Sequence, residues 1–422
     1  MVLYIDPGTG SMLFALAMSL AATIYFLLQK VLFQMKLVLK GGKIDKSIGR
    51  VEDLPFVIFT DDKRYWEMFK PICEEFERRK RKLVYWTCSE DDPGLKAEYE
   101  YVKAECIGDI YKASVRLNRM KAGICITTTP GLDVYQWKRS KDTGWYIHMM
   151  HGAGDAATYK MLGLDFFDAV LVSGRHQEEE IRRVEQVRGL PEKEVQIVGE
   201  SHMDSLRGRL NSMKREENDK ITVLLAPSWG ESAILSRYGN RIIEALLKTG
   251  YRIIVRPHPQ TVVSEKDILD KLMAEYPESE DFIWNFDNDN FDVLNRSDIM
   301  ISDFSSVIWD YTLVFDKPVI FTDVTYDLSQ YDLAWLGEKE RWEMRVLPKV
   351  GLPLDVEALS DMKKLIDQAL VSDQLQAGRE SVREEAWGNI GKSAVKVADY
   401  MIQKYDLMYP KQDHIPVTAV AE

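Results

Sequence analysis

The segment Ile299-Met300-Ile301-Ser302-Asp303-Phe304-Ser305-Ser306-Val307-Ile308-Trp309-Asp310 decides the fold class of this chain. Its apolar beginning predicts a buried strand, its end predicts the start of a helix, and small hydroxyl residues form the turn between them. The first amides of a helix have no intrahelical partner, and the helix dipole adds partial positive charge there. We therefore expect Ser305 and Ser306 to hold phosphate, with a simple helix cap by Ser305 as the alternative.

Two more predicted strands end in residues that suit a ligand site. One strand ends in Arg256-Pro257-His258-Pro259, and an earlier one ends in His148-Met149-Met150-His151-Gly152-Ala153-Gly154. Ligands of open α/β sheets bind beyond the carboxyl ends of the strands. The three strand ends are therefore expected to contribute to one site.

Short apolar runs alternate with amphipathic segments along most of the chain, which is typical of a parallel sheet covered by helices. Charged amphipathic helices are predicted over 64–82 and 177–188. Strands are predicted over 56–59, 83–86, 123–126, 145–148, 169–172 and 195–198 in the first half, and over 221–226, 251–255, 282–284, 298–301 and 318–321 in the second.

The order of these motifs resembles that of the CDP-glycerol glycerophosphotransferases, which prime and polymerise teichoic acids and related polyol-phosphate polymers. In that family a His-Gly pair closes a strand in the first half. An Ala-Pro-Thr-aromatic segment, R-x-H-P and S-D-Y-S-S with an acidic residue one helical turn later then follow in the second half. The matching segments here are His151-Gly152, Ala226-Pro227-Ser228-Trp229, Arg256-Pro257-His258-Pro259 and Ser302-Asp303-Phe304-Ser305-Ser306 with Asp310.

The resemblance implies an α/β fold of the GT-B type, in which two Rossmann-like, doubly wound domains face a cleft. A polar segment over 207–220 interrupts the hydrophobic pattern and marks the boundary between the domains. The predicted parts are a membrane anchor with a basic collar (1–50), an acceptor-side domain (51–215), a nucleotide-donor domain (216–388), a helix that crosses back to the first domain (389–408) and a tail (409–422).

The resemblance also suggests roles for single residues. His151 titrates in a range that suits a general base, and His258, held between two prolines, is expected to donate to a phosphate oxygen. A structural histidine is the alternative at both positions. Gly152 and Gly154 would let the backbone approach a ligand closely.

The donor-binding set combines the phosphate-holding turn with residues at neighbouring strand ends. Asp310 lies four residues after Ser306 and would accept hydrogen bonds from ribose hydroxyls, unless it is only a solvated helix residue. The predicted donor-binding residues are Ser228, Arg256, Ser302, Asp303, Ser305, Ser306 and Asp310. For two of them an alternative stays open, because Arg256 could face solvent and Asp303 could orient the phosphate-holding loop without contact to the substrate.

Composition excludes several classes of protein and site. The formal net charge of -12 argues against nonspecific nucleic-acid binding, which needs a basic surface. The four cysteines, Cys73, Cys88, Cys106 and Cys125, have no zinc or disulfide spacing and are expected to be reduced thiols. No cofactor is expected besides the nucleotide-activated substrate, and the family resemblance implies catalysis without a metal.

Residues 12–33 form an apolar run of about the 20 residues that cross a bilayer. Basic residues follow this run, so residues 1–50 hold six basic and two acidic side chains. The positive-inside rule then places the following domains in the cytoplasm. We predict a single-pass anchor in the cell membrane, with a buried core helix and an interfacial helix as alternatives.

The sequence as a whole predicts a membrane-associated transferase. It would move glycerol phosphate, or a related polyol phosphate, from a CDP-activated donor to a hydroxyl of a lipid-linked cell-envelope acceptor and release CMP. A GT-B glycosyltransferase or epimerase that uses a nucleotide sugar is one alternative. A noncatalytic membrane scaffold with the same fold is another.

Overall fold

A computed structural model describes residues 54–135, 137–213, 219–287, 289–303, 305–322, 328–337, 341–355 and 358–410. The predicted anchor over 12–33 and the tail after 410 therefore lie outside the described residues. Within the described ranges, no helix is both long enough and apolar enough to cross a membrane.

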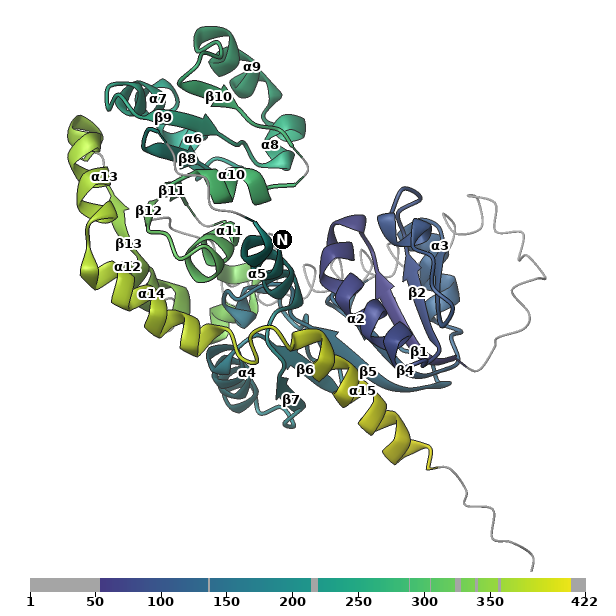
Figure 1. The fold of residues 1–422 in the computed structure, drawn as a ribbon. Helices are drawn as coiled ribbons and strands as arrows, with labels where there is room; N and C mark the ends of the chain where they lie inside the picture. Colours follow the sequence, from purple (N-terminus) through teal and green to yellow (C-terminus); the bar gives the residue numbers. More distant parts are fainter. Residues whose placement is uncertain are drawn as a thin grey trace, which may run out of the picture.

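The described residues form two parallel sheets, each covered by helices (Figure 1). The first has seven strands in the order β3-β2-β1-β4-β5-β6-β7, and the second has six in the order β10-β9-β8-β11-β12-β13. The first sheet contains β1 (Leu54–Thr60), β2 (Leu83–Thr87), β3 (Val102–Cys106), β4 (Ala122–Thr127), β5 (Thr143–Met149), β6 (Ala169–Val172) and β7 (Glu194–Ile197). The second contains β8 (Thr222–Leu225), β9 (Arg252–Val255), β10 (Phe282–Trp284), β11 (Ile299–Ser302), β12 (Val319–Thr322) and β13 (Gly351–Leu354).

The strand predictions are confirmed at all eleven places, and the structure adds β3 and β13 at the sheet edges. The two predicted helices correspond to α2 (Trp66–Arg78) and α4 (Arg175–Arg188). The change from one sheet to the other falls between Ile197 and Thr222. The predicted boundary at 215/216 lies in a stretch, 214–218, outside the described residues.

Each central strand is buried on both faces, which explains its continuous apolar sequence. In β1, Phe56 and Ile58 pack on one side of the first sheet with α2 and the C-terminal helix, while Val57 and Phe59 pack on the other side with α3 (Ile110–Leu117). The second sheet is covered in the same way. Its helices are α6 (Ile234–Tyr238), α7 (Asn240–Leu247), α8 (Pro259–Ser264), α9 (Lys266–Glu275), α10 (Phe291–Arg296), α11 (Val307–Trp309), α12 (Trp342–Val350), α13 (Met362–Leu370) and α14 (Asp373–Ala386).

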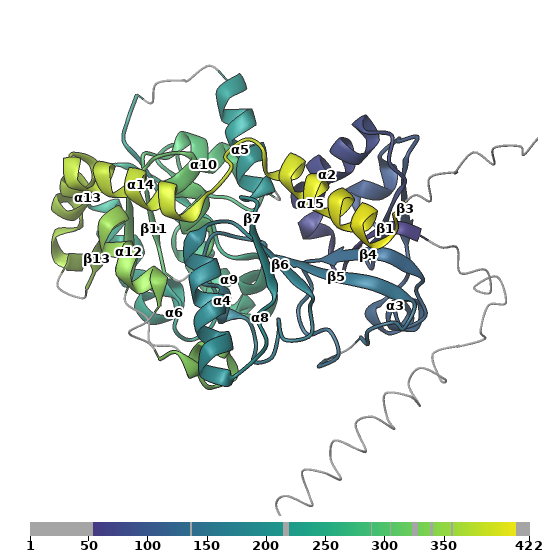
Figure 2. The ribbon, with the colours of Figure 1, turned by 90° about the horizontal axis from the view of Figure 1, so that it is seen from below.

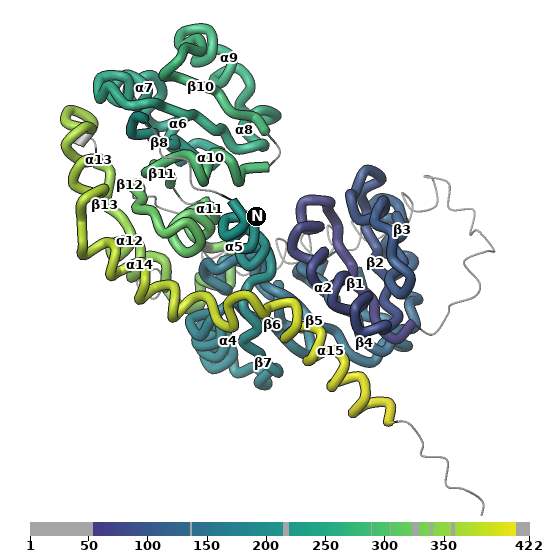
Figure 3. The backbone as a smooth tube through the Cα atoms, viewed as in Figure 1, coloured from purple at the N-terminus to yellow at the C-terminus, as the bar shows by residue number. Residues whose placement is uncertain are grey.

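The C-terminal helix α15 (Ser393–Met408) returns to the first domain, where it lies along α2 (Figures 2 and 3). Its start is fixed by Asp204 of α5 (Ser201–Ser212), whose carboxylate accepts from the Gly391 amide at 2.6 Å and the Ser393 amide at 2.9 Å. Gly123 of β4 leaves room for the ring of Tyr405, since a Cβ there would lie 2.3 Å from that ring. The helix thus ties the second domain back to the first.

Candidate functional site

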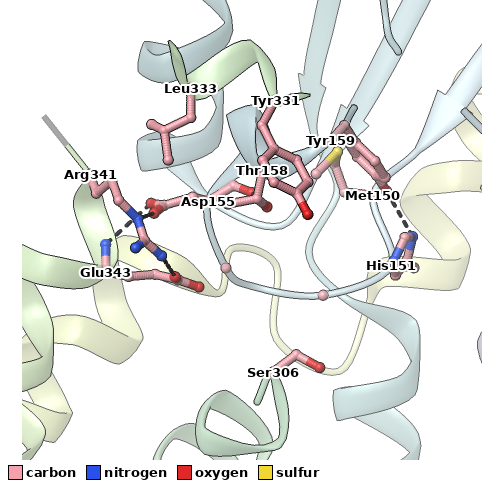
Figure 4. A pocket seen from close by; sticks show the side chains of 12 residues that line it. Met150, His151, Asp155, Thr158, Tyr159, Ser306, Tyr331, Leu333, Arg341 and Glu343 are labelled. Carbon is pink, nitrogen blue, oxygen red and sulfur yellow. Dashed lines mark hydrogen bonds and ion pairs between the residues drawn. The ribbon is translucent and has the colours of Figure 1, made fainter. Parts of the chain in front are cut away.

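A pocket of about 330 Å³ lies between the two domains, at loops that follow the carboxyl ends of the strands (Figure 4). The first domain contributes the segment after β5, and the second contributes the turn after β11 and the segment before α12. The lining residues are Met150, His151, Gly152, Gly154, Asp155, Thr158, Tyr159, Ser306, Tyr331, Leu333, Arg341 and Glu343. Two predicted site residues from different domains, His151 and Ser306, therefore share one pocket.

His151 is held through one of its two ring nitrogens. Its Nδ1 lies 2.8 Å from the Thr128 hydroxyl and 2.7 Å from the Tyr159 hydroxyl. Because Nδ1 is occupied, Nε2 is the nitrogen that remains for a ligand. The ring is open to the pocket but enclosed by protein on its other sides, and this desolvation, with the nearby charge of Arg64, lowers the pKa of His151 to about 4. The imidazole is therefore neutral near pH 7, as a general base must be.

Helix α4 fixes the loop that follows His151. The Gln177 side-chain amide donates to the carbonyl oxygens of Gly152 and Gly154, both at 2.8 Å. His176 Nε2 lies 2.9 Å from the Ala153 carbonyl oxygen, so this nitrogen carries the proton. These three contacts pull the carbonyl groups of the loop toward α4, and Gly152 is left facing open space.

A second group of contacts joins the loop to the other domain (Figure 4). Buried Asp155 accepts from Arg341 Nε at 3.3 Å and from the Glu343 amide at 3.2 Å, and Arg341 also donates to Glu343 at 2.7 Å. A Cβ on Gly154 would lie 2.5 Å from Glu343 Oε1. Gly154 therefore lies both in the pocket lining and at the contact between the domains.

Trp342, which lies between Arg341 and Glu343 in sequence, strengthens the same contact. Its ring stacks on His176 of the first domain with centroids 3.9 Å apart, and it packs against Trp309 at 4.8 Å. Trp309 Nε1 donates to Glu343 at 3.2 Å. Sequence reasoning missed Arg341, Trp342 and Glu343, because no motif marks a segment whose partners lie in the other domain.

His258 begins helix α8 and caps it. Its Nδ1 accepts a hydrogen bond from the Gln260 amide at 3.0 Å. An imidazole that accepts at Nδ1 must carry its proton on Nε2 when neutral. Half-burial and the charge of Arg64 lower the pKa of His258, so this neutral form is favoured near pH 7. His258 is therefore fixed as an Nε2–H donor, which suits the predicted contact with a phosphate oxygen.

The predicted phosphate-holding turn is partly exposed to the pocket. Ser306 is exposed and lines the pocket, and Ser305 is half-buried beside it. The following helix α11 continues as a π-helical turn, η5 (Asp310–Val314), a form that often occurs at functional sites. Burial raises the pKa of Asp310, the first residue of this turn, to about 7. Ser228 is buried nearby, and its amide is bonded to Asp303.

Three predicted donor-binding residues have polar groups that are bonded within the protein. The Ser302 hydroxyl is fully buried and donates to the Ala226 carbonyl oxygen at 2.6 Å. The Asp303 carboxylate accepts from the amides of Ser228 at 2.8 Å and Ile234 at 3.0 Å.

Arg256 is the third of these residues. It donates to the Asn285 side chain and, at 2.7 Å, to the Asp287 carbonyl oxygen. It therefore ties the end of β9 to the end of β10. Among the described residues, no group of three or more His, Cys, Asp or Glu side chains is placed to hold a metal ion.

Comparison with protein families agrees with this geometry. Residues 186–336 match the family model described as CDP-Glycerol:Poly(glycerophosphate) glycerophosphotransferase. The predicted resemblance to the CDP-glycerol glycerophosphotransferase family is confirmed. The matched range includes His258 and the turn with Ser305 and Ser306, and it agrees with the enzyme class predicted from the motifs.

Two bacterial proteins are similar to parts of the chain. The minor teichoic acid biosynthesis protein GgaB of Bacillus subtilis (strain 168) is 29% identical over 160 residues, which are 31% of this chain and 17% of GgaB. The teichoic acid glycerol-phosphate primase of Bacillus spizizenii is 29% identical over 194 residues, which are 44% of each chain. The chain thus matches less than half the length of these relatives.

Solved structures show the same fold. The wall teichoic acid polymerase TagF, in crystals soaked with CDPG, aligns with a TM-score of 0.57 and 16% identity over 91% of this chain and 98% of that chain. The S. aureus MnaA-UDP structure aligns with a TM-score of 0.55 and 11% identity over 84% of this chain and 97% of that chain. The predicted GT-B-like arrangement of two α/β domains is confirmed by these likenesses.

Proposed function

We propose that the protein transfers glycerol phosphate, or a related polyol phosphate, from a CDP-activated donor to a hydroxyl group of a lipid-linked cell-envelope acceptor and releases CMP. The observation that carries the proposal is the shared pocket. It joins a neutral histidine of the first domain, His151, to the serine turn of the second domain at Ser306. The family match over 186–336 favours a CDP-glycerol donor for that turn.

In the proposed reaction, His151 Nε2 takes the proton of the acceptor hydroxyl as its oxygen attacks the phosphorus that bears the glycerol. A bond forms between the acceptor oxygen and this phosphorus. The bond from the phosphorus to the bridging oxygen of the donor breaks, and CMP leaves with that oxygen and its electron pair. Thr128 and Tyr159 hold the ring through Nδ1 while Nε2 becomes protonated.

The second domain is suited to the charge that develops on the leaving group. His258 presents a fixed Nε2–H, which can donate to an oxygen of the departing phosphate. Ser305 and Ser306 add hydroxyl groups and amides at the beginning of the helical turn. Asp310 would accept a hydrogen bond from a ribose hydroxyl of the donor.

A position at the membrane would favour this reaction, because confinement to a surface raises the effective concentration of a lipid-linked acceptor. The apolar run over 12–33 and the basic residues after it motivate this part of the proposal.

The proposal is tested by CMP release from CDP-glycerol. Detergent-purified protein is supplied with a bacterial lipid extract, and the unaltered chain is compared with His151→Ala and His258→Ala. We expect release that is lost in both variants and retained in His202→Ala, which changes a partly exposed histidine on α5 outside the pocket lining. Release of UDP from UDP-GlcNAc in place of CMP from CDP-glycerol would instead support a nucleotide-sugar enzyme.

A further inference from the structure

Arg64 and Tyr65 occupy the position in the first sheet where the strand order reverses. They belong to the short helix η2 (Lys63–Tyr65), directly after β1. From β1, the strands run to β2 and β3 on one side and to β4 through β7 on the other. The loops after β1 and β4 therefore diverge, and such a switch point is the usual place for a ligand in an open α/β sheet.

Contacts connect Arg64 to the proposed base through one aromatic ring. The guanidinium lies over the Tyr65 ring, 5.0 Å from its centroid, and the Tyr65 ring lies 5.2 Å from the His151 ring. The Arg64 side chain is 67% exposed, and its ion pair with Asp62 is long, at 3.8 Å. A guanidinium has five N–H donors in a planar fork, so most of these donors remain for a ligand.

The charge of Arg64 acts on both domains. It contributes to the lowered pKa of His151 in the first domain and of His258 in the second. Its charge therefore lies close enough to affect both histidines, and the phosphates of the donor are expected between them.

Two other arginines, Arg341 and Arg256, are already engaged within the protein. Arg341 is 5% exposed and is paired with Asp155 and Glu343. Arg256 is bonded to Asn285 and to the Asp287 carbonyl oxygen. A pyrophosphate carries at least two negative charges, and phosphoryl transfer depends on positive groups that offset them.

We propose that Arg64 is the cation that binds the diphosphate of the nucleotide donor, next to His151. This inference rests on the proposed function. The guanidinium fork would pair with oxygens of the phosphoryl group that is transferred and orient it toward the attacking hydroxyl. Once an anion neutralises Arg64, its effect on His151 is removed, so donor binding would make His151 a stronger base.

Inorganic pyrophosphate is a probe of this site that does not require turnover. We expect Arg64→Gln to weaken its binding, measured by calorimetry on the detergent-purified full chain, at least tenfold, which is the range for loss of charge-assisted hydrogen bonds. Arg64→Lys should retain part of the affinity, because it keeps the charge and loses the fork. Arg119→Gln, a change at an exposed arginine in the turn before β4, is the matched control and should bind as the unaltered chain does.

Histidine NMR gives a second readout, with the His151 signal identified by its loss in His151→Ala. In the unaltered chain, pyrophosphate should raise the pKa of His151, and in Arg64→Gln this pKa should already be higher without ligand. Unchanged pyrophosphate affinity together with an unchanged His151 pKa in Arg64→Gln would overturn the inference. Absence of CMP release from the unaltered chain would refute the proposed function but not the role of Arg64. That role is decided separately, by pyrophosphate affinity and by the pKa of His151.

Discussion

Thr128 and Tyr159 provide a strong quantitative test of the site, because both contact the same atom. A neutral His151 that acts as a base at Nε2 carries its proton on Nδ1 and can donate it to only one oxygen at a time. The two hydroxyl groups, at 2.8 and 2.7 Å from Nδ1, are therefore alternative partners for a single N–H. Removal of one should be compensated by the other, whereas removal of both leaves Nδ1 without a protein partner.

The hydrogen bonds to Nδ1 set the expected loss of kcat in each variant. Tyr159→Phe or Thr128→Val alone should cost less than the net value of a hydrogen bond, about 0.5–1.5 kcal/mol, and therefore less than about tenfold in kcat. The double variant should cost about 1–3 kcal/mol, the penalty for an unpaired polar group, which corresponds to about fivefold to 150-fold. Because water in the pocket can reach the ring, we expect the lower part of that range.

The assay is the single-turnover rate of CMP release from CDP-glycerol for the unaltered chain, both single variants and the double variant. Tyr135→Phe is the control, because the Tyr135 hydroxyl donates to the Met161 carbonyl oxygen and lies outside the pocket lining. We expect the loss in the double variant to exceed the product of the single losses. Single losses that multiply to give the double loss would refute the idea that the two hydroxyls substitute for each other.

Two further predictions concern pH and the C-terminal helix. Since a base must be unprotonated and the pKa of His151 is lowered to about 4, protonation of His151 should lower kcat/KM only as the pH falls toward 4. Asp310, whose pKa is raised to about 7, titrates in the same range as an ordinary histidine, so the profile is measured in Asp310→Asn, where kcat/KM should stay constant from pH 8 to below 6. A decline centred near 6.5 in that variant would contradict the assignment, with circular dichroism at each pH as the check on folding. Gly123→Ala places a Cβ against the Tyr405 ring and should lower the free energy of unfolding by about 1–3 kcal/mol, measured by thermal or denaturant unfolding. The control is Gly208→Ala, an exposed change on α5 with open space at the Cβ position, which should be neutral or stabilising. Equal effects of the two changes would contradict the packing of α15 against β4.

The central strands could be predicted from sequence because burial on both faces requires continuous apolar runs. Ala169–Val172 is a clear example, since it is an inner strand with all four residues buried and the predicted and observed limits of β6 are the same. The two strands that were missed lie at the edges of the sheets. β3 alternates buried Val102 with exposed Lys103, and β13 contains Pro353, so neither has the sequence of a buried strand.

The site was predictable where its residues follow strand ends in recognisable motifs. His151, His258 and Ser306 come from three such places, and the structure places His151 and Ser306 in the lining of one pocket. The sequence could not show that Ser302 is buried while Ser306 is exposed. Only the pairing of β11 with β8 brings the Ser302 hydroxyl to the carbonyl oxygen of Ala226, directly after β8.

The residues that support the site could not be predicted, because their roles depend on long-range packing. Thr128 and Tyr159 reach His151 from separate loops. Arg341 and Asp155 are 186 positions apart in sequence, and neither is part of a motif. The fold of the first domain brings Thr128 and Tyr159 to His151, and the placement of the two domains brings Arg341 to Asp155.

Transfer of labelled glycerol phosphate is the decisive test of His151 as the base of a glycerophosphotransferase. CDP-[¹⁴C]glycerol and a bacterial lipid extract are incubated with the detergent-purified full chain or with His151→Ala, and the label in the lipid fraction is measured together with CMP. We expect label to enter the lipid fraction in a one-to-one ratio with released CMP, and both to stop in His151→Ala. Label that never enters the lipid fraction, or transfer that continues unchanged in His151→Ala, would contradict this expectation.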